Sequence, residues 1–264
     1  MKSVMFAVVI GVLSLTVAGC SKDDSPVPAG TGEVRMYLTD SPATFDAVNI
    51  VVNRVEVHQA NADSSSGWVT INATPYTYDL LTLTNGQTAI LGNATLAAGT
   101  YTQIRLIIDT GSNVVVAGVP FTLQIPSGMQ TGLKLVHQFT IESNATTELT
   151  FDFDAARSII LTGNGQYMLK PVIRVQANDV SGSMSGTVFQ PDARARVWTN
   201  VAGDTVSTAA DTTNGSFRLV ALPQGSYSVR FETSVSAYSD TTINGVVVTA
   251  NHDTNLGTIM LPSR

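Results

Sequence analysis

Apolar and polar residues alternate along most of this chain with a period of two, the pattern of β-strands that bury one face. The clearest apolar sets, whose intervening residues are mostly polar, are Val34/Met36/Leu38, Ile104/Leu106/Ile108, Leu133/Leu135/Phe139/Ile141 and Leu149/Phe151/Phe153. Gly, Pro and Asn separate these runs, as in the turns of sandwich folds. Ala155–Leu161 is the one segment that suits a short helix, because Asp154 can cap its first turn. We therefore predict an all-β fold.

The alternation changes register once. One apolar set occupies positions 48, 50 and 52, and it continues at positions 55 and 57 in the opposite register. Because a slip of one residue would send a strand's apolar side chains to the wrong face, such a change indicates a β-bulge. We predict this bulge near Asn53–Arg54.

A short motif occurs twice, as Leu96-Ala-Ala-Gly99-Thr-Tyr101 and as Leu222-Pro-Gln-Gly225-Ser-Tyr227. In each copy a glycine stands two positions before a tyrosine, and an alternating strand follows. This spacing favours a tight turn and a tyrosine whose hydroxyl bonds nearby backbone, as in the tyrosine corner of sandwich domains. Two sandwiches of related topology are therefore predicted, rather than an array of repeats.

The only cysteine, Cys20, ends an N-terminal apolar run at residues 4–18. This run is shorter than the ~20 residues of a membrane-spanning helix, and small residues precede the cysteine, as at a signal-peptide cleavage site. Val17-Ala-Gly-Cys20 resembles the lipobox of bacterial lipoproteins. The resemblance implies cleavage before Cys20 and acylation there, so that lipid anchors the protein to a membrane. A transmembrane helix and an ordinary secretory signal are the alternatives.

The residues after Cys20 bear on location. Ser21 resembles the outer-membrane sorting pattern of Gram-negative lipoproteins, and Lys22-Asp-Asp24 resembles a surface-export signal of Bacteroidetes. Residues 25–32 are rich in Pro, Gly and Ser or Thr and suit an extended tether. These resemblances imply an outer-membrane lipoprotein, on either the periplasmic or the cell-surface side.

Both halves of the chain resemble known families. Leu38-Thr-Asp40-x-Pro42, Val55-Glu-Val-His58 and Tyr167-x-Leu-x-Pro171 resemble domain of unknown function 4382, which is common in bacterial lipoproteins. Asn214-Gly215-Ser-Phe217 and the second copy of the repeated motif resemble the carboxypeptidase-regulatory-like, or transthyretin-like, sandwich. The resemblances imply two tandem β-sandwich domains of immunoglobulin/transthyretin-like, carbohydrate-binding-like type. The predicted organisation is a signal peptide (1–19), a lipidated cysteine and tether (20–31), a first sandwich (32–177), a linker (178–182) and a second sandwich (183–264).

Composition excludes some functions. Only 13% of the residues are charged and the formal net charge is −6. Without a basic stripe to neutralise phosphates, nucleic-acid binding is not expected. With Cys20 acylated no disulfide can form, so both sandwiches must rest on their hydrophobic cores.

Catalytic signatures are missing. The sequence has no GxSxG elbow, no HExxH pair and no glycine-rich phosphate loop, so we predict no enzyme, no cofactor and no metal site. Asp152 and Asp154 could offer carboxylates to Ca²⁺, but a solvent-facing Asp152 and a capping Asp154 explain the pair better. His58 is expected on the surface at a strand end, and His137 in the core.

Aromatic residues are the better candidates for a binding site. Trp68, Tyr76 and Tyr78 flank one predicted turn, and Asn61 and Asp63 lie just upstream. Flat aromatic faces stack on sugars while amides and carboxylates bond the hydroxyls, so this group is a candidate carbohydrate platform. A Trp68 that anchors the core is the alternative.

A second candidate surface lies in the C-terminal half. Ala195 and Val197 are expected to point inward, which places Arg194, Arg196 and Trp198 on the outer face of the strand. A tryptophan beside two arginines suits a contact surface. A domain–domain interface and arginine stems covering the ring are the rival interpretations.

The sequence therefore predicts a non-enzymatic, envelope-anchored binding or adhesion lipoprotein whose partner is a glycan or another envelope protein. A structural subunit of a fimbria-like surface assembly is the alternative, and a hydrolase with unrecognised carboxylates is the third hypothesis.

Overall fold

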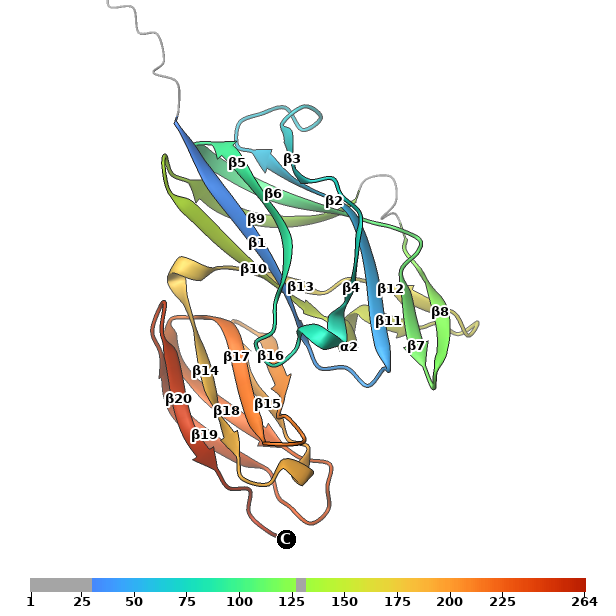
Figure 1. The fold of residues 1–264 in the computed structure, drawn as a ribbon, viewed down its shortest axis with the longest axis vertical. Helices are drawn as coiled ribbons and strands as arrows, with labels where there is room; N and C mark the ends of the chain where they lie inside the picture. Colours follow the sequence, from blue (N-terminus) through green and yellow to red (C-terminus); the bar gives the residue numbers. More distant parts are fainter. Residues whose placement is uncertain (1–29, 127–131) are drawn as a thin grey trace, which may run out of the picture.

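The computed structural model describes residues 30–126 and 132–264. Within them the chain forms two β-sandwiches joined at a short 3₁₀ turn, η2 (Asn178–Val180) (Figure 1). The predicted signal peptide, Cys20 and most of the predicted tether lie outside the described residues. None of the described helices is long and apolar enough to span a membrane.

The N-terminal sandwich has a four-stranded and a nine-stranded sheet. The smaller sheet runs in the order β13 (Ile173–Ala177), β10 (Thr146–Asp154), β1 (Thr31–Ser41) and β5 (Ala89–Ala97). The larger sheet contains β11 (Ile159–Leu161), β12 (Tyr167–Leu169), β8 (Val119–Gln124), β7 (Asn113–Val116), β2 (Ala47–Gln59), β6 (Gly99–Ile108) and β9 (Leu133–Ile141), and β3 (Trp68–Asn72) and β4 (Tyr76–Asp79) also pair with β2. Two short helices, η1 (Leu80–Leu83) and α2 (Ala155–Ser158), complete it.

The C-terminal sandwich is smaller. One sheet runs in the order β17 (Ser216–Pro223), β14 (Ser181–Val188) and β20 (Asp253–Ile259). The other runs β16 (Asp204–Ala209), β15 (Arg196–Val201), β18 (Gly225–Glu232) and β19 (Thr241–Val248), with η3 (Pro191–Ala193) leading into β15.

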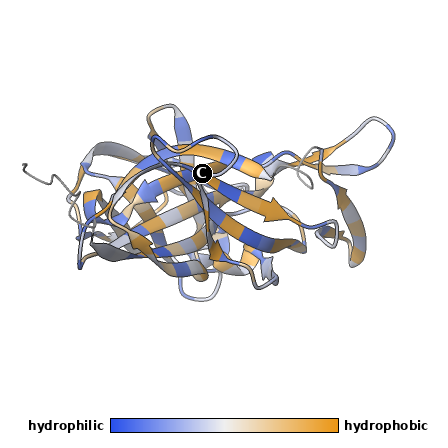
Figure 2. Ribbon diagram, turned by 90° about the horizontal axis from the view of Figure 1, so that it is seen from above, coloured by the Kyte–Doolittle hydropathy of each residue, from blue (hydrophilic) through white to orange (hydrophobic). Residues whose placement is uncertain are grey.

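Each sandwich buries its own apolar core, and the strands show the predicted alternation of apolar and polar residues (Figure 2). The all-β tandem-sandwich prediction is confirmed. The bulge is confirmed as well, because the pairing of β2 with β6 shifts register between Val52 and Arg54. Asp154 caps α2 through a 2.9 Å bond from Arg157 N, but the helix stops at Ser158 because the next residues form β11.

The repeated motif occupies the same place in both sandwiches. In each, the first strand pairs parallel with a late strand (β1 with β10, β14 with β20) and antiparallel with the strand that ends in the motif, β5 or β17. The chain then turns into the opposite sheet. Tyr101 Oη donates to Ala97 O at 3.1 Å, and Tyr227 Oη donates to Pro223 O at 2.6 Å. The two sandwiches therefore share a topology and a tyrosine corner.

The Tyr101→Phe variant should be less stable by about 1 kcal/mol, because the ring stays buried while the Ala97 carbonyl loses its donor. Urea unfolding measures this difference. Tyr76→Phe is the control, since Tyr76 is exposed. Equal stability of Tyr101→Phe and the unaltered protein would show that the Tyr101–Ala97 hydrogen bond makes no net contribution to stability.

Candidate ligand groove between the two sandwiches

The N-terminal sandwich docks on an edge strand of the C-terminal one. β17 ends its sheet, so its outward backbone groups need partners. Asn85, in the loop between η1 and β5, supplies them. Its Oδ1 accepts from Arg218 N at 2.6 Å, and its Nδ2 donates to Ser216 O at 3.3 Å. Asn85 has a φ of 58°, a left-handed conformation that asparagine tolerates better than most residues.

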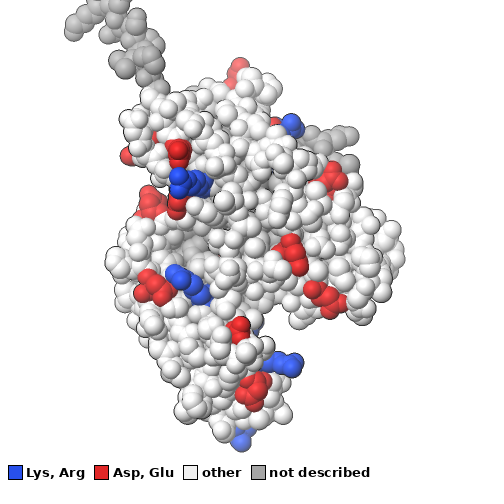
Figure 3. All heavy atoms as spheres, viewed as in Figure 1, with Lys and Arg blue, Asp and Glu red and all other residues white. Residues whose placement is uncertain are grey.

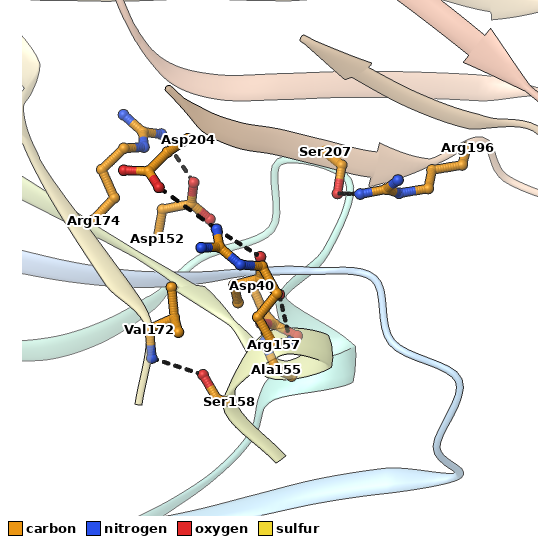
Figure 4. Close-up of polar contacts among 11 residues, drawn as sticks. Asp40, Asp152, Ala155, Arg157, Ser158, Val172, Arg174, Arg196, Asp204 and Ser207 are labelled. Carbon is orange, nitrogen blue, oxygen red and sulfur yellow. Dashed lines mark hydrogen bonds and ion pairs between the residues drawn. The ribbon is translucent and has the colours of Figure 1, made fainter. Parts of the chain in front are cut away.

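The arginine of a buried ion pair within the N-terminal sandwich makes the second contact (Figure 4). Arg174 of β13 donates to Asp152 Oδ2 at 2.9 Å and, through its other terminal nitrogen, to Ala221 O of β17 at 2.6 Å. Asp152 is 9% exposed. The prediction that it faces solvent was wrong, because the C-terminal sandwich covers that face of β10. Burial raises the pKa of the Asp152 carboxyl, and Arg174 opposes the rise.

Asp40 is buried at the same junction. Its Oδ1 accepts from Ala155 N at 2.9 Å, while its Oδ2 has no hydrogen-bond partner among the described residues. A cavity of about 10 Å³ lies beside it, bordered by Ser207 and Arg218. Burial is the main reason that the pKa of Asp40 rises to about 9, and the Asp152 carboxyl adds to the rise. Asp40 is therefore an uncharged acid at neutral pH.

Next to these contacts the surface is hollowed between the two sandwiches, with acidic and basic side chains near the hollow (Figure 3). The hollow has a volume of about 510 Å³. β14, β17 and β20 form its floor, which includes Arg218 and Asp253, and the N-terminal sandwich forms its wall, which includes Tyr37 and Glu148. We call this hollow the groove.

The carboxylates on the groove wall and floor accept hydrogen bonds from neighbouring side chains. On the wall, Glu148 accepts from Tyr37 Oη at 3.2 Å and from Asn178 Nδ2 at 3.3 Å. On the floor, Asp253 accepts from the hydroxyls of two serines of β14, Ser183 and Ser185, at 2.5 Å each. The groove therefore offers preorganised hydrogen-bonding groups.

Arg218 completes the floor. Its terminal nitrogen lies 3.0 Å from Ser183 Oγ and 3.6 Å from Asp253 Oδ1. Burial opposes ionisation of Asp253, but bonds from the two serines, with Arg218 nearby, lower the pKa of its carboxyl below the ordinary value. The floor therefore carries an ionised aspartate beside a guanidinium, and the two charges compensate each other.

The residues predicted as a sugar platform fall into two separate groups rather than one. Trp68 pairs with His58 of β2, and Tyr76 pairs with Val52 of the same strand. His58 and Val52 are six residues apart, a distance of ~20 Å along the strand. Tyr78 is 4% exposed and donates to Ile90 O at 2.9 Å. Arg105 lies 4.1 Å above the Trp68 ring. Exposed Tyr76 packs on Tyr78, and Asn61 and Asp63 lie exposed in the loop before Trp68.

The predicted contact surface around Trp198 is only partly formed. Ala195 and Val197 point inward as expected, and Arg196 shares the outer face with Trp198. Arg194, however, has a φ of 49° in the turn before β15 and does not belong to the strand. The guanidinium over the Trp198 ring, at 5.8 Å, is that of Arg230 on β18, because Arg230 pairs directly opposite Trp198.

The histidines need one correction. His58 is 5% exposed rather than on the surface, because the loop before Trp68 folds back on it and Trp68 meets its ring edge-on at 5.0 Å. His137 is half-buried on β9, and burial lowers its pKa. Within the described residues no group of three or more His, Cys, Asp or Glu is placed to hold a metal ion.

Nothing in the sequence marks the groove residues Tyr37, Glu148, Arg218 and Asp253 as members of one site. Each looks like an ordinary polar position of an alternating strand. Ser183, Ser185 and Asp253 are polar positions of the predicted second sandwich. A single sequence does not show which strands pair, so it does not place these three residues together.

Comparison with known proteins gives one family. Residues 31–171 match the family model described as Domain of unknown function (DUF4382), which confirms the resemblance of the N-terminal half. No curated protein matches the chain. The resemblance of the C-terminal half to carboxypeptidase-regulatory-like sandwiches stays a prediction.

Solved structures give weak similarities. A cohesin–X-dockerin complex from Acetivibrio cellulolyticus contains a chain that is 24% identical to this protein. The match covers 31% of this protein and 58% of the other chain, with a TM-score of 0.25. GBS52, the minor pilin of Streptococcus agalactiae, is 12% identical over 87% of this chain and 96% of its own, with a TM-score of 0.26. BcpA, the major pilin of Bacillus cereus, is 11% identical over 89% of this chain and 100% of its own, with a TM-score of 0.25. TM-scores this low carry no inference about function.

Proposed function

This chain belongs to the DUF4382 family, whose function is unknown, and we propose that it is a non-enzymatic binding module of the cell envelope that holds carbohydrate in the groove. The single observation that carries the proposal is the groove itself. Its volume suits a ligand site, and its floor and wall present hydroxyl, amide, carboxylate and guanidinium groups. These are the groups that bond sugar hydroxyls, and Tyr37 adds an aromatic ring.

The ionised Asp253 and the inaccessible Asp40 favour binding over hydrolysis. A glycoside hydrolase needs one carboxyl with a raised pKa as a general acid, facing the substrate. In the groove, Asp253 has a lowered pKa and is ionised. Asp40 has the raised pKa of an acid, but it is buried beside a cavity of about 10 Å³ that no sugar can enter.

The proposal includes a lipid anchor at Cys20, in the outer membrane of a Gram-negative cell. Its support is the lipobox-like sequence. β1 begins at the end of the N-terminal sandwich that lies away from the C-terminal sandwich (Figure 1). An anchor at this end would leave the groove on the side away from the membrane, where polymers outside the bilayer can reach it.

The test is a polysaccharide array with the unlipidated chain, residues 21–264. Arg218→Gln should lower the affinity for a bound glycan at least tenfold, because it removes the guanidinium from the groove floor. Arg230→Gln is the matched control and should bind normally. The two side chains are 50% and 46% exposed, and each lies within 4 Å of an aspartate.

Other outcomes have definite meanings. If Trp68→Ala abolishes binding and Arg218→Gln does not, the ligand lies on Trp68 and the groove assignment is wrong. If the folded protein binds no glycan, carbohydrate binding is rejected, and the fimbria-like assembly role becomes the hypothesis to test by isolation of envelope partners.

A further inference from the structure

A second hollow continues the first along the same sheet face. It has a volume of about 520 Å³, and Ser185, Thr187, Asn255 and Thr258 lie on its floor. Asn85 and Gln87 of the N-terminal sandwich border it, as Tyr37 and Glu148 border the first hollow. Arg218 lines both hollows.

Strand register places the two floors in line. In the parallel pair of β14 and β20, Ser183 stands beside Asp253, Ser185 beside Asn255 and Thr187 beside Thr258. Alternate residues of a strand point to one face, so the polar members of β14 form a row. From Ser181 in the first hollow to Thr187 in the second, this row is ~20 Å long at ~3.3 Å per residue.

The charges along this row compensate each other. Arg218 lies where the hollows meet, 3.6 Å from Asp253. On the wall, Glu148 accepts hydrogen bonds from Tyr37 and Asn178, and Arg35 lies 4.0 Å from its carboxylate. The second hollow is lined by hydroxyl, amide and backbone groups, with Arg218 as its one charged side chain. Such a surface suits an uncharged chain with many hydroxyls better than a polyanion or a peptide whose charges all have the same sign.

We propose that the two hollows form one continuous site for a linear, uncharged polysaccharide that lies along β14 and contacts both sandwiches. This inference rests on the proposed function and specifies its ligand. Short fragments occupy the first hollow, and longer ones gain affinity by reaching the second. The gain follows from linked binding, since the second segment is held close once the first is bound.

The experiment uses neutral glucans, mannans and xylans and their fragments of two to eight sugar units, with affinities measured by calorimetry on residues 21–264. Affinity should rise at least tenfold with length and then level off. Thr258→Trp, at an exposed strand position, fills the second hollow and should remove this gain while leaving the affinity for short fragments unchanged. Val247→Trp, exposed on the opposite sheet, is the matched control.

Each outcome decides between the two proposals. Short fragments that bind as tightly as polymers, with Thr258→Trp neutral, would overturn the continuous site and leave a one-hollow carbohydrate site standing. An affinity lost equally for all lengths in Thr258→Trp would also overturn it. No binding to these neutral polysaccharides by the folded protein would overturn the extended site, and a blank on the whole polysaccharide array as well would overturn the proposed function.

Discussion

Raising the pH from 5 to 8 should lower the free energy of unfolding of this protein by up to about 4 kcal/mol, and the Asp40→Asn variant should not show this loss. The pKa of Asp40 rises from 3.8 in the unfolded chain to about 9 in the folded one. Between these values the folded state holds a proton that the unfolded state has released, so stability falls as pH rises. The slope is about 1.4 kcal/mol per pH unit for one group. Asparagine has nearly the same shape and no charge to bury.

Urea unfolding of both proteins at pH 5, 6, 7 and 8 measures this difference. Comparing the variant with its parent removes the contributions of carboxyls that do not interact with Asp40. Asp204→Asn is the control, because Asp204 lies at the same junction with a side chain that is 57% exposed. The free energy of unfolding of this variant should change with pH in parallel with that of the parent. Parallel curves for Asp40→Asn and the parent would mean that Asp40 is ionised in the folded protein.

Arg174→Met should destabilise the protein by about 3–5 kcal/mol, the usual result of removing one member of a buried ion pair. Asp152 would lose its counter-ion in a buried site, and the Ala221 carbonyl would lose its donor. The double variant Arg174→Met/Asp152→Asn should recover part of the loss, because no charge is then left unpaired. Urea unfolding followed by tryptophan fluorescence reports on both sandwiches, since Trp68 lies in one and Trp198 in the other.

Arg157→Met provides the matched control. Arg157 spans the same junction to Asp204 at 3.6 Å, but the two side chains are 50% and 57% exposed. An exposed pair contributes about 0–1 kcal/mol. If Arg174→Met cost no more than Arg157→Met, the buried pair would contribute no more to stability than the exposed pair does.

Strand β10 shows how much of the fold the sequence reveals. Its apolar positions Leu149, Phe151 and Phe153 are buried, as alternation predicts. Its polar positions were expected to face solvent, yet Thr150 and Asp152 are also buried. Alternation identifies the apolar face of a strand, whereas what covers the polar face depends on how the two sandwiches dock.

The same limit applies to the candidate site. The tyrosine corners were predictable because each is a local motif, with hydroxyl and acceptor four residues apart. The groove was not, because Tyr37 and Asp253 lie on strands far apart in sequence. Trp68 and Tyr76 are close in sequence, but they pair with distant positions on one long strand.

Asn85 has a consequence for how copies of this protein behave when crowded. A strand with free backbone groups is a template on which another molecule can add its own strand, and such additions lead to aggregation or domain exchange. Here the side-chain amide of Asn85 occupies that position on β17. Self-association through this strand therefore requires the two sandwiches to separate first, so solubility at high concentration depends on the same contacts that shape the groove.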